Sequence, residues 1–262
     1  TVESVTTSQV GEATIMRGSG NEPVQKVVVK VSGDKGSIAL SNLTFNSGAT
    51  TNQADITKAT LYYTAKSSGF IANNSLGTSN GSTLSFDLTG VNLPDAGEYY
   101  FWLAYDINKT ATAGNTVAST LSSITADNTV ITTITTATPV NRIIKAGFSG
   151  EYVVGKSSTA NYSTINAALL AMKDGIEGPV KMKLEAGTYA ENVVIRNIRG
   201  ASATNTITFT SLSGNNDDVI ISGAGYSEPA YGAVKYGMFC VDSTSNVVVE
   251  NISFKPTDQN YP

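Results

Sequence analysis

The sequence predicts an all-β chain in two parts, an antiparallel β-sandwich followed by a short parallel solenoid that begins with a capping helix. The first part consists of short runs of alternating apolar and polar residues and lacks a helical period. In the second part, two interleaved sets of apolar runs recur at similar intervals. Only 15% of residues are charged, and Thr, Ser, Asn and Gly supply the polarity, which suits strands joined by turns. We place the domains at residues 1–144 and 145–262.

Roughly eight strand-like runs make up the first part. In "VQKVVVKVSG", Val27, Val29 and Val31 share one face. The apolar phase of "SIALSNLTFN" slips by one residue, which predicts a β-bulge near Ser41 and Asn42. The spacing of the runs is typical of an antiparallel sandwich.

The stretch "GEYYFWLAYDINKTATAGN" concentrates aromatic residues and contains the only tryptophan of the chain. Strand alternation predicts that one face packs in the core and consists of Tyr99, Phe101, Leu103 and Tyr105. Tyr100 and Trp102 then lie on the outer face, where they could stack on a sugar. The alternative, which we favour, is that both are structural and that a neighbouring segment covers Trp102.

The second part opens with the one convincing helix, "STINAALLAMKDG", with Ser163 as N-cap and Gly175 at the C-cap position. Its predicted buried stripe consists of Ile165, Ala168, Leu169 and Met172. The apolar runs that follow form one ladder at 180–184, 206–210 and 238–241, and another at 193–195, 219–221 and 247–249. Such ladders are typical of a parallel solenoid, whose open end the helix would cap.

The segments "DITKATLYYTAKSSGF", "FDLTG" and "GEYYFWLAYDINKTATAGN" resemble the small domain at the N-terminus of BNR-repeat sialidases from gut Bacteroidetes. The resemblance covers about residues 12–142. It implies a β-sandwich accessory domain associated with carbohydrate. It does not imply sialidase activity, because the Asp-box repeats and arginine triad of the sialidase propeller are not found in the rest of the sequence.

The segment "YSTINAALLAM...GPVKMKLEAGTYAENVVI" is similar to the opening of right-handed parallel β-helix proteins of the pectin-lyase-like group, over about residues 150–254. The resemblance implies a right-handed parallel β-helix with an N-terminal capping helix and about three coils. In such enzymes the catalytic groups lie on later coils, and we interpret Glu191 as a turn residue. We expect the column to be truncated, or its last coil to be covered by the first domain or a partner.

The main candidate site is the loop "SGAGYSEPAYGAVKYG" at residues 222–237. It spaces Tyr226, Tyr231 and Tyr236 evenly and places Glu228 beside them. Exposed tyrosine rings can stack on a sugar while carboxylates bind its hydroxyl groups, and solenoid insertions often form a binding face. The alternative is an ordinary loop whose tyrosines pack back on the column.

The composition excludes several chemistries. Without histidine, Ser-His-Asp and Cys-His mechanisms and histidine-ligated metal sites are excluded. Cys240, in "MFCVD", is interpreted as an inert core thiol, and "GNNDD" at 214–218 as a solvated turn rather than a calcium loop. We identify no phosphate loop and expect no catalytic residues, metal or cofactor. A net charge of −4 without a basic patch argues against nucleic acid, and the lack of a long apolar run argues against membrane insertion.

Together these observations predict a secreted or cell-surface, non-enzymatic module for carbohydrate binding or adhesion. Its expected partners are glycans or a surface protein, and its expected location is extracellular or on a bacterial cell surface. One alternative is the N-terminal portion of a polysaccharide lyase or pectinesterase-like enzyme whose catalytic coils lie beyond this chain. Another alternative is a structural spacer.

Overall fold

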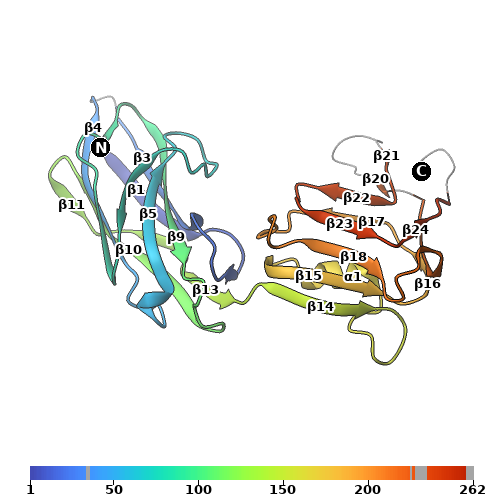
Figure 1. The fold of residues 1–262 in the computed structure, drawn as a ribbon. Coiled ribbons are helices and arrows are strands. Elements are labelled where there is room, and N and C mark those ends of the chain that lie inside the picture. Colours follow the sequence, from blue (N-terminus) through green and yellow to red (C-terminus); the bar gives the residue numbers. More distant parts are fainter. Residues whose placement is uncertain (34–35, 225, 228–234, 258–262) are drawn as a thin grey trace. The chain divides into compact units, whose positions relative to one another are not determined.

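The computed structural model describes residues 1–33, 36–224, 226–227 and 235–257. Contacts divide the chain into two compact units, Thr1–Ala146 and Gly147–Pro262. Strands dominate both units, which confirms the predicted all-β class (Figure 1).

Two sheets build the first unit. The first has six strands in the order β12 (Thr135–Thr138), β1 (Val2–Gln9), β3 (Glu22–Val31), β9 (Gly97–Ile107), β5 (Ile56–Tyr63) and β6 (Ser75–Ser79). The second follows the order β2 (Thr14–Met16), β13 (Val140–Lys145), β10 (Thr116–Ala126), β4 (Ile38–Asn46) and β7 (Thr83–Asp87), with β11 (Thr129–Ile131) on β10 and β8 (Asn92–Leu93) on β4. Side chains from both sheets enclose one apolar core, as expected for a sandwich.

The alternation of β9 is as predicted, because the four side chains assigned to the core are all buried there. The predicted bulge is also confirmed. Where β10 pairs with β4, Thr125 lies opposite Asn42 but Ala126 lies opposite Leu40, so Ser41 is the extra residue.

Residues of the "DI" and "GN" motifs hold two connections of the first unit together. Asp55 ends the short 3-10 helix Gln53–Asp55 before β5 and is buried. Its Oδ2 accepts a hydrogen bond from Asn115 Nδ2 at 2.7 Å, and its backbone carbonyl accepts one from the Asn108 backbone N–H at 2.8 Å. These bonds tie the β4–β5 connection to the β9–β10 connection, so these motif residues stabilise the sandwich.

The described residues of the second unit include three parallel sheets and an α-helix. The first sheet has the order β14 (Phe148–Val154), β15 (Ile176–Leu184), β18 (Ile207–Ser211) and β23 (Val247–Glu250). The other two are β16 (Gly187–Ala190), β19 (Val219–Ser222) and β24 (Ser253–Phe254), and β17 (Val193–Arg196) with β22 (Phe239–Asp242). A second 3-10 helix, Asn216–Asp218, precedes β19. All three sheets contribute to one core, which the helix α1 (Ile165–Ala171) joins.

One step of the two predicted ladders is confirmed, from the run at 180–184 to the run at 206–210, and the other steps are wrong. The run at 180–184 is followed by 207–211 and then by 247–250, whereas 239–242 pairs with 193–196. The run at 219–222 belongs to a third sheet, between β16 and β24. Strand β16, with the sequence GTYA, contains no apolar run, and the long insertion at 223–238 lengthens the later spacing. Counting intervals between apolar runs therefore cannot assign them to sheets.

The helix is confirmed, and its predicted apolar stripe is buried. Its N-cap is Thr164 and not Ser163, because Thr164 Oγ1 accepts the Ala167 N–H at 3.0 Å. Met172, not Gly175, is the C-cap residue. The core position predicted for Cys240 is also wrong. This residue is half-buried and in register with half-buried Val194, on the face opposite to the core.

Candidate functional site

The main predicted site falls largely on residues that the structure does not describe. Two short strands, β20 (Tyr226–Ser227) and β21 (Lys235–Tyr236), pair in antiparallel fashion and bring the backbones of Tyr226 and Tyr236 opposite each other. Glu228 and Tyr231 lie outside the described residues. The binding role of this loop therefore stays a prediction.

Trp102 lies under a neighbouring segment, as in the interpretation favoured above. Its side chain is 4% exposed, and its indole Nε1 donates to Thr64 Oγ1 at 2.9 Å. The ring of Phe70 covers it at 5.8 Å between centroids. Tyr100 is half-buried, and its hydroxyl donates to Glu98 Oε2 at 2.6 Å. A sugar could stack on Trp102 only if the segment carrying Phe70 moved away.

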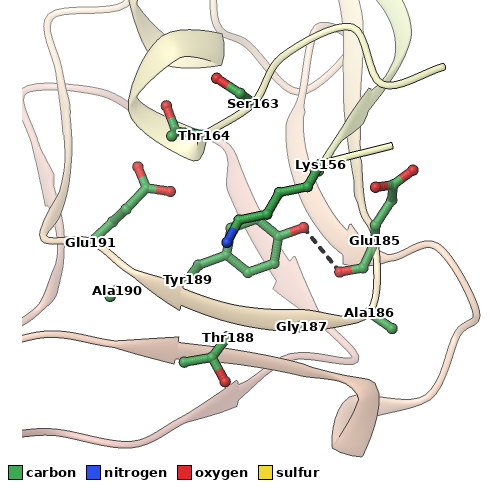
Figure 2. Close-up of a pocket in the computed structure, with 11 residues that line it drawn as sticks. Lys156, Ser163, Thr164, Glu185, Ala186, Gly187, Thr188, Tyr189, Ala190 and Glu191 are labelled. Atoms are coloured by element: carbon green, nitrogen blue, oxygen red, sulfur yellow. Dashed lines mark hydrogen bonds between the residues drawn. The ribbon is translucent and has the colours of Figure 1, made fainter. Parts of the chain in front are cut away.

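A pocket of about 280 Å³ in the second unit gathers the polar groups that the sequence reasoning did not bring together (Figure 2). It lies among the loop after β14, the start of α1 and strand β16 with its flanking residues. Its lining consists of Gly155, Lys156, Ser163, Thr164, Glu185, Ala186, Gly187, Thr188, Tyr189, Ala190 and Glu191.

Glu185 is fixed on one side of the pocket by the loop after β14. Its carboxylate accepts hydrogen bonds from the Ser157 N–H, at 3.0 Å, and from the Ser157 hydroxyl. These bonds hold the pKa of Glu185 below its usual range, because they stabilise the ionised form. A Cβ atom at position 155 would lie 2.0 Å from Glu185 Oε2, so any larger residue there would displace the Glu185 side chain from this position.

This loop contains a pattern that the sequence reasoning overlooked. The string "GEYVVGKS" at residues 150–157 has the spacing of a phosphate-binding loop. That loop, however, lies between a strand and a helix and wraps a phosphate with its backbone. Here residues 150–154 are part of β14, the loop does not lead directly into a helix, and Glu185 occupies the Ser157 N–H. The pattern does not form a phosphate site.

Glu191 is fixed on the other side by the helix. Its Oε1 accepts the Ile165 N–H at 3.0 Å, and its Oε2 accepts the Asn166 N–H at 2.9 Å. These are amide groups of the first turn of α1, which lack partners within the helix. Glu191 therefore caps the helix, which is more specific than the turn role predicted for it.

Tyr189 forms an apolar wall of the pocket. Its ring is buried, and its hydroxyl lies 2.8 Å from the Val154 carbonyl oxygen and 2.9 Å from that of Glu185. Burial, with a smaller contribution from the charge of Glu185, raises the pKa of Tyr189 to about 12. The phenol is therefore neutral and immobile at physiological pH.

Three polar groups of the pocket have no partner among the described residues. They are the ammonium group of Lys156 and the hydroxyl groups of Ser163 and Thr188, all on exposed residues. Figure 2 shows Lys156 extending into the pocket in front of the Tyr189 ring. Since Lys156 forms no ion pair with a described residue, its ammonium group and the two carboxylates remain separated across the pocket.

This arrangement offers hydrogen bonds and a hydrophobic wall. The bonds that Glu185 and Glu191 accept hold both carboxylates in place for structural reasons. The residues that the structure describes contain no cluster of three or more His, Cys, Asp or Glu that could hold a metal ion. None of the described helices is long and apolar enough to cross a membrane.

Among the comparisons with known proteins, only the comparison with solved structures found matches. No family model and no curated protein sequence matches the chain. One similar solved structure is the Hadza microbial sialidase Hz136, with 16% identity over 51% of this chain and a TM-score of 0.41; the match spans 30% of the sialidase. The CaDoc0917–CaCohA2 complex is 20% identical over 55% of this chain and 99% of the other, with a TM-score of 0.31. The sixth cohesin of Acetivibrio cellulolyticus scaffoldin B, in complex with the Cel5 dockerin, is 16% identical over 55% and 97% of the two chains, with a TM-score of 0.27.

Proposed function

We propose that this protein is a non-catalytic module that binds carbohydrate, and that the pocket of Figure 2 receives a single sugar unit or the end of a glycan chain. The observation that carries the proposal is the unpartnered ammonium group of Lys156, which shares a pocket with two immobilised carboxylates. A volume of about 280 Å³ lies at the small end of ligand pockets, which fits one sugar ring better than an extended chain.

The separation between Lys156 and the carboxylates favours a ligand with neighbouring hydroxyl groups. A hydroxyl group both donates and accepts hydrogen bonds, so one can accept from Lys156 while the next donates to Glu185 or Glu191. Each carboxylate oxygen has lone pairs beyond those its protein donors use. The hydroxyls of Ser163 and Thr188 add contacts that can adapt to the ligand.

The pocket supports binding better than catalysis. A pair of catalytic carboxyl groups needs one member that is held protonated. Glu185 has the opposite property, because its hydrogen bonds with Ser157 favour the ionised form. Glu191 is committed to the helix through both oxygens.

The folds of the two domains, the location and the partners that we propose are those predicted from the sequence. The three parallel sheets are the strand arrangement expected of the first coils of a right-handed parallel β-helix, and the sandwich would be a carbohydrate-associated accessory domain. We place the module outside the cell or on a bacterial surface, with glycans or a surface protein as partners. The loop with Tyr226, Glu228, Tyr231 and Tyr236 would be a second contact for a longer glycan.

A glycan array followed by titration calorimetry tests this function. We expect Lys156→Met to weaken binding of the best glycan at least tenfold, because a hydrogen bond to a charged group is lost. Thr188→Val, which preserves shape, should weaken it several-fold. Lys173→Met removes an exposed lysine that does not line the pocket, so it should leave affinity unchanged. An array without signals, or equal affinity of Lys156→Met and the parent, would refute the proposal.

A further inference from the structure

We propose that the outer face of the first sheet in the first unit holds a second sugar site, in which a pyranose ring takes the place of Phe70 and stacks on Trp102. Phe70 then belongs to a displaceable lid, which we define as the connection between β5 and β6 at residues 64–74. The choice of a sugar rests on the carbohydrate-binding function proposed above, whereas the site shares no residue with the pocket of Figure 2.

The side chains around Trp102 form a cluster that is separate from the sandwich core. This outer cluster consists of Val10, Tyr62, Phe70, Tyr100, Trp102 and Ala104. The core between the two sheets is made of other residues. The sandwich can therefore stay packed when Phe70 leaves the outer cluster.

The lid is anchored at its two ends and free of hydrogen bonds between them. At one end the Tyr100 N–H donates to the Ala65 carbonyl oxygen at 2.9 Å. At the other end the Tyr63 N–H donates to the Asn74 carbonyl oxygen at 3.1 Å. Residues 68–73 form no hydrogen bond with any residue that the structure describes. Such a segment opens locally at a smaller free energy than the strands that carry it.

A single ring holds the middle of the lid against the sheet. Half-buried Phe70 meets Tyr62 at 5.5 Å and Trp102 at 5.8 Å between ring centroids, and neither contact is a parallel stack. The next residue, Ile71, is 54% exposed and adds nothing to the outer cluster. Phe70 is thus a stand-in that shows what the seat accepts, which is one six-membered ring.

A buried hydroxyl group on the same face lacks a partner. Thr60 is 3% exposed, and its Oγ1 forms no hydrogen bond within the described part of the chain. Its neighbours Ala59 and Leu61 belong to the sandwich core, so Thr60 points to the outer face. There it lies opposite Ala104, a member of the outer cluster. Since buried polar groups normally have partners, a ligand that brings a hydroxyl group into the cluster would satisfy it.

The surroundings of Trp102 favour a sugar over an entirely apolar ring. The aromatic floor would bury the C–H face of a pyranose. Its hydroxyl groups would meet polar groups at the edge, such as the Tyr100 hydroxyl, which donates to Glu98 Oε2 at 2.6 Å. An aromatic side chain of a partner protein would fill the seat of Phe70 but leave Thr60 Oγ1 without a partner.

A fluorescence titration of the full chain tests the site, because Trp102 is the only tryptophan. The probes are methyl β-galactoside, methyl β-glucoside and, for a peptide ligand, N-acetylphenylalaninamide. We expect one of the glycosides to change the emission weakly and saturably. Phe70→Ala should bind that glycoside at least tenfold more tightly, because a closed lid leaves only a minor state, of at most about 10%, able to bind. Phe70→Leu gives the same test with a smaller gain if the alanine variant does not fold.

Two matched variants separate binding from a structural effect. Adding Thr60→Val to Phe70→Ala should weaken the glycoside several-fold without lowering the urea midpoint, because the lost hydroxyl group has no partner in the free protein. Ile71→Ala alters the exposed neighbour of Phe70 and should leave the affinity of the parent unchanged.

The outcomes distinguish this site from the pocket of the second unit. No saturable change with either glycoside in folded Phe70→Ala, or equal affinities of Phe70→Ala and the parent, would overturn the lid-covered site. Binding of N-acetylphenylalaninamide alone would overturn it in favour of a peptide ligand. A Trp102 signal that Lys156→Met abolishes would assign the sugar to the pocket instead, whereas a signal that survives while the glycan array fails would refute the pocket alone.

Discussion

Arg142→Met should strongly destabilise the first unit. The Arg142 side chain is 0% exposed and joins the start of β3 to the neighbourhood of β2. Its Nε and Nη2 donate to the Thr14 carbonyl oxygen at 3.2 and 2.6 Å, and its Nη1 donates to the Pro23 carbonyl oxygen at 3.2 Å. Nη2 also lies 3.1 Å from Glu22 Oε1. Methionine would fill part of the volume but donate none of these bonds.

The expected loss can be bounded from these contacts. Each hydrogen bond with a charged partner contributes roughly 1.5–3 kcal/mol, and removing one member of a buried ion pair costs roughly 3–5 kcal/mol. The Glu22 side chain is 15% exposed, so water can partly replace the guanidinium. The lower end of the range therefore applies, and we expect the free energy of unfolding of the first unit to fall by about 3 kcal/mol.

Urea unfolding followed by tryptophan fluorescence is a suitable assay, because Trp102 is the only tryptophan and lies in the first unit. With a denaturant dependence of roughly 2 kcal/mol per M, the midpoint should fall by about 1.5 M. Lys30→Met breaks an exposed ion pair with Glu3, formed at 2.7 Å, and should not shift it measurably. A shift below about 0.5 M for Arg142→Met would refute the reasoning, since it would mean that the buried bonds contribute little.

Three further outcomes follow from the structure. Phe70→Ala should move the Trp102 emission to longer wavelength and increase acrylamide quenching, because it uncovers the indole; an unchanged spectrum would contradict the covering role. Glu191→Ala should raise hydrogen-exchange rates of the first α1 amides about tenfold through loss of its cap, with Asn166→Ala as a control that retains the capping carboxylate. Burial raises the pKa of Tyr63 to about 12, from about 10 in unfolded chains. As the pH rises, the unfolded state therefore loses the Tyr63 proton before the folded state does. The free energy of unfolding should fall between pH 10 and pH 12 as a result. Tyr63→Phe should reduce that fall in urea midpoints, and an equal fall in both proteins would count against it.

The inward and outward faces of a strand could be predicted from the sequence where the alternation of adjacent residues alone determines them. The inward set on β9 and the bulge at Ser41 follow from a period of two residues and its interruption. The helix α1 could also be predicted from a local pattern, although its N-cap is Thr164, one residue after the predicted Ser163. Beyond the step from 180–184 to 206–210, the pairing of parallel strands could not be predicted, because β16 contains no apolar run and the insertion at 223–238 breaks the regular spacing.

The sequence by itself determined the all-β class, the core faces of β3 and β9 and the exclusion of histidine chemistry, because these depend on local periodicity and composition. Only the tertiary structure decided that Phe70 covers Trp102 and that Lys156 shares a pocket with Glu185 and Glu191. These contacts join segments whose separation along the chain follows no period. Their positions depend on which strands pair and which loops fold over them, and this is settled only when the whole core packs.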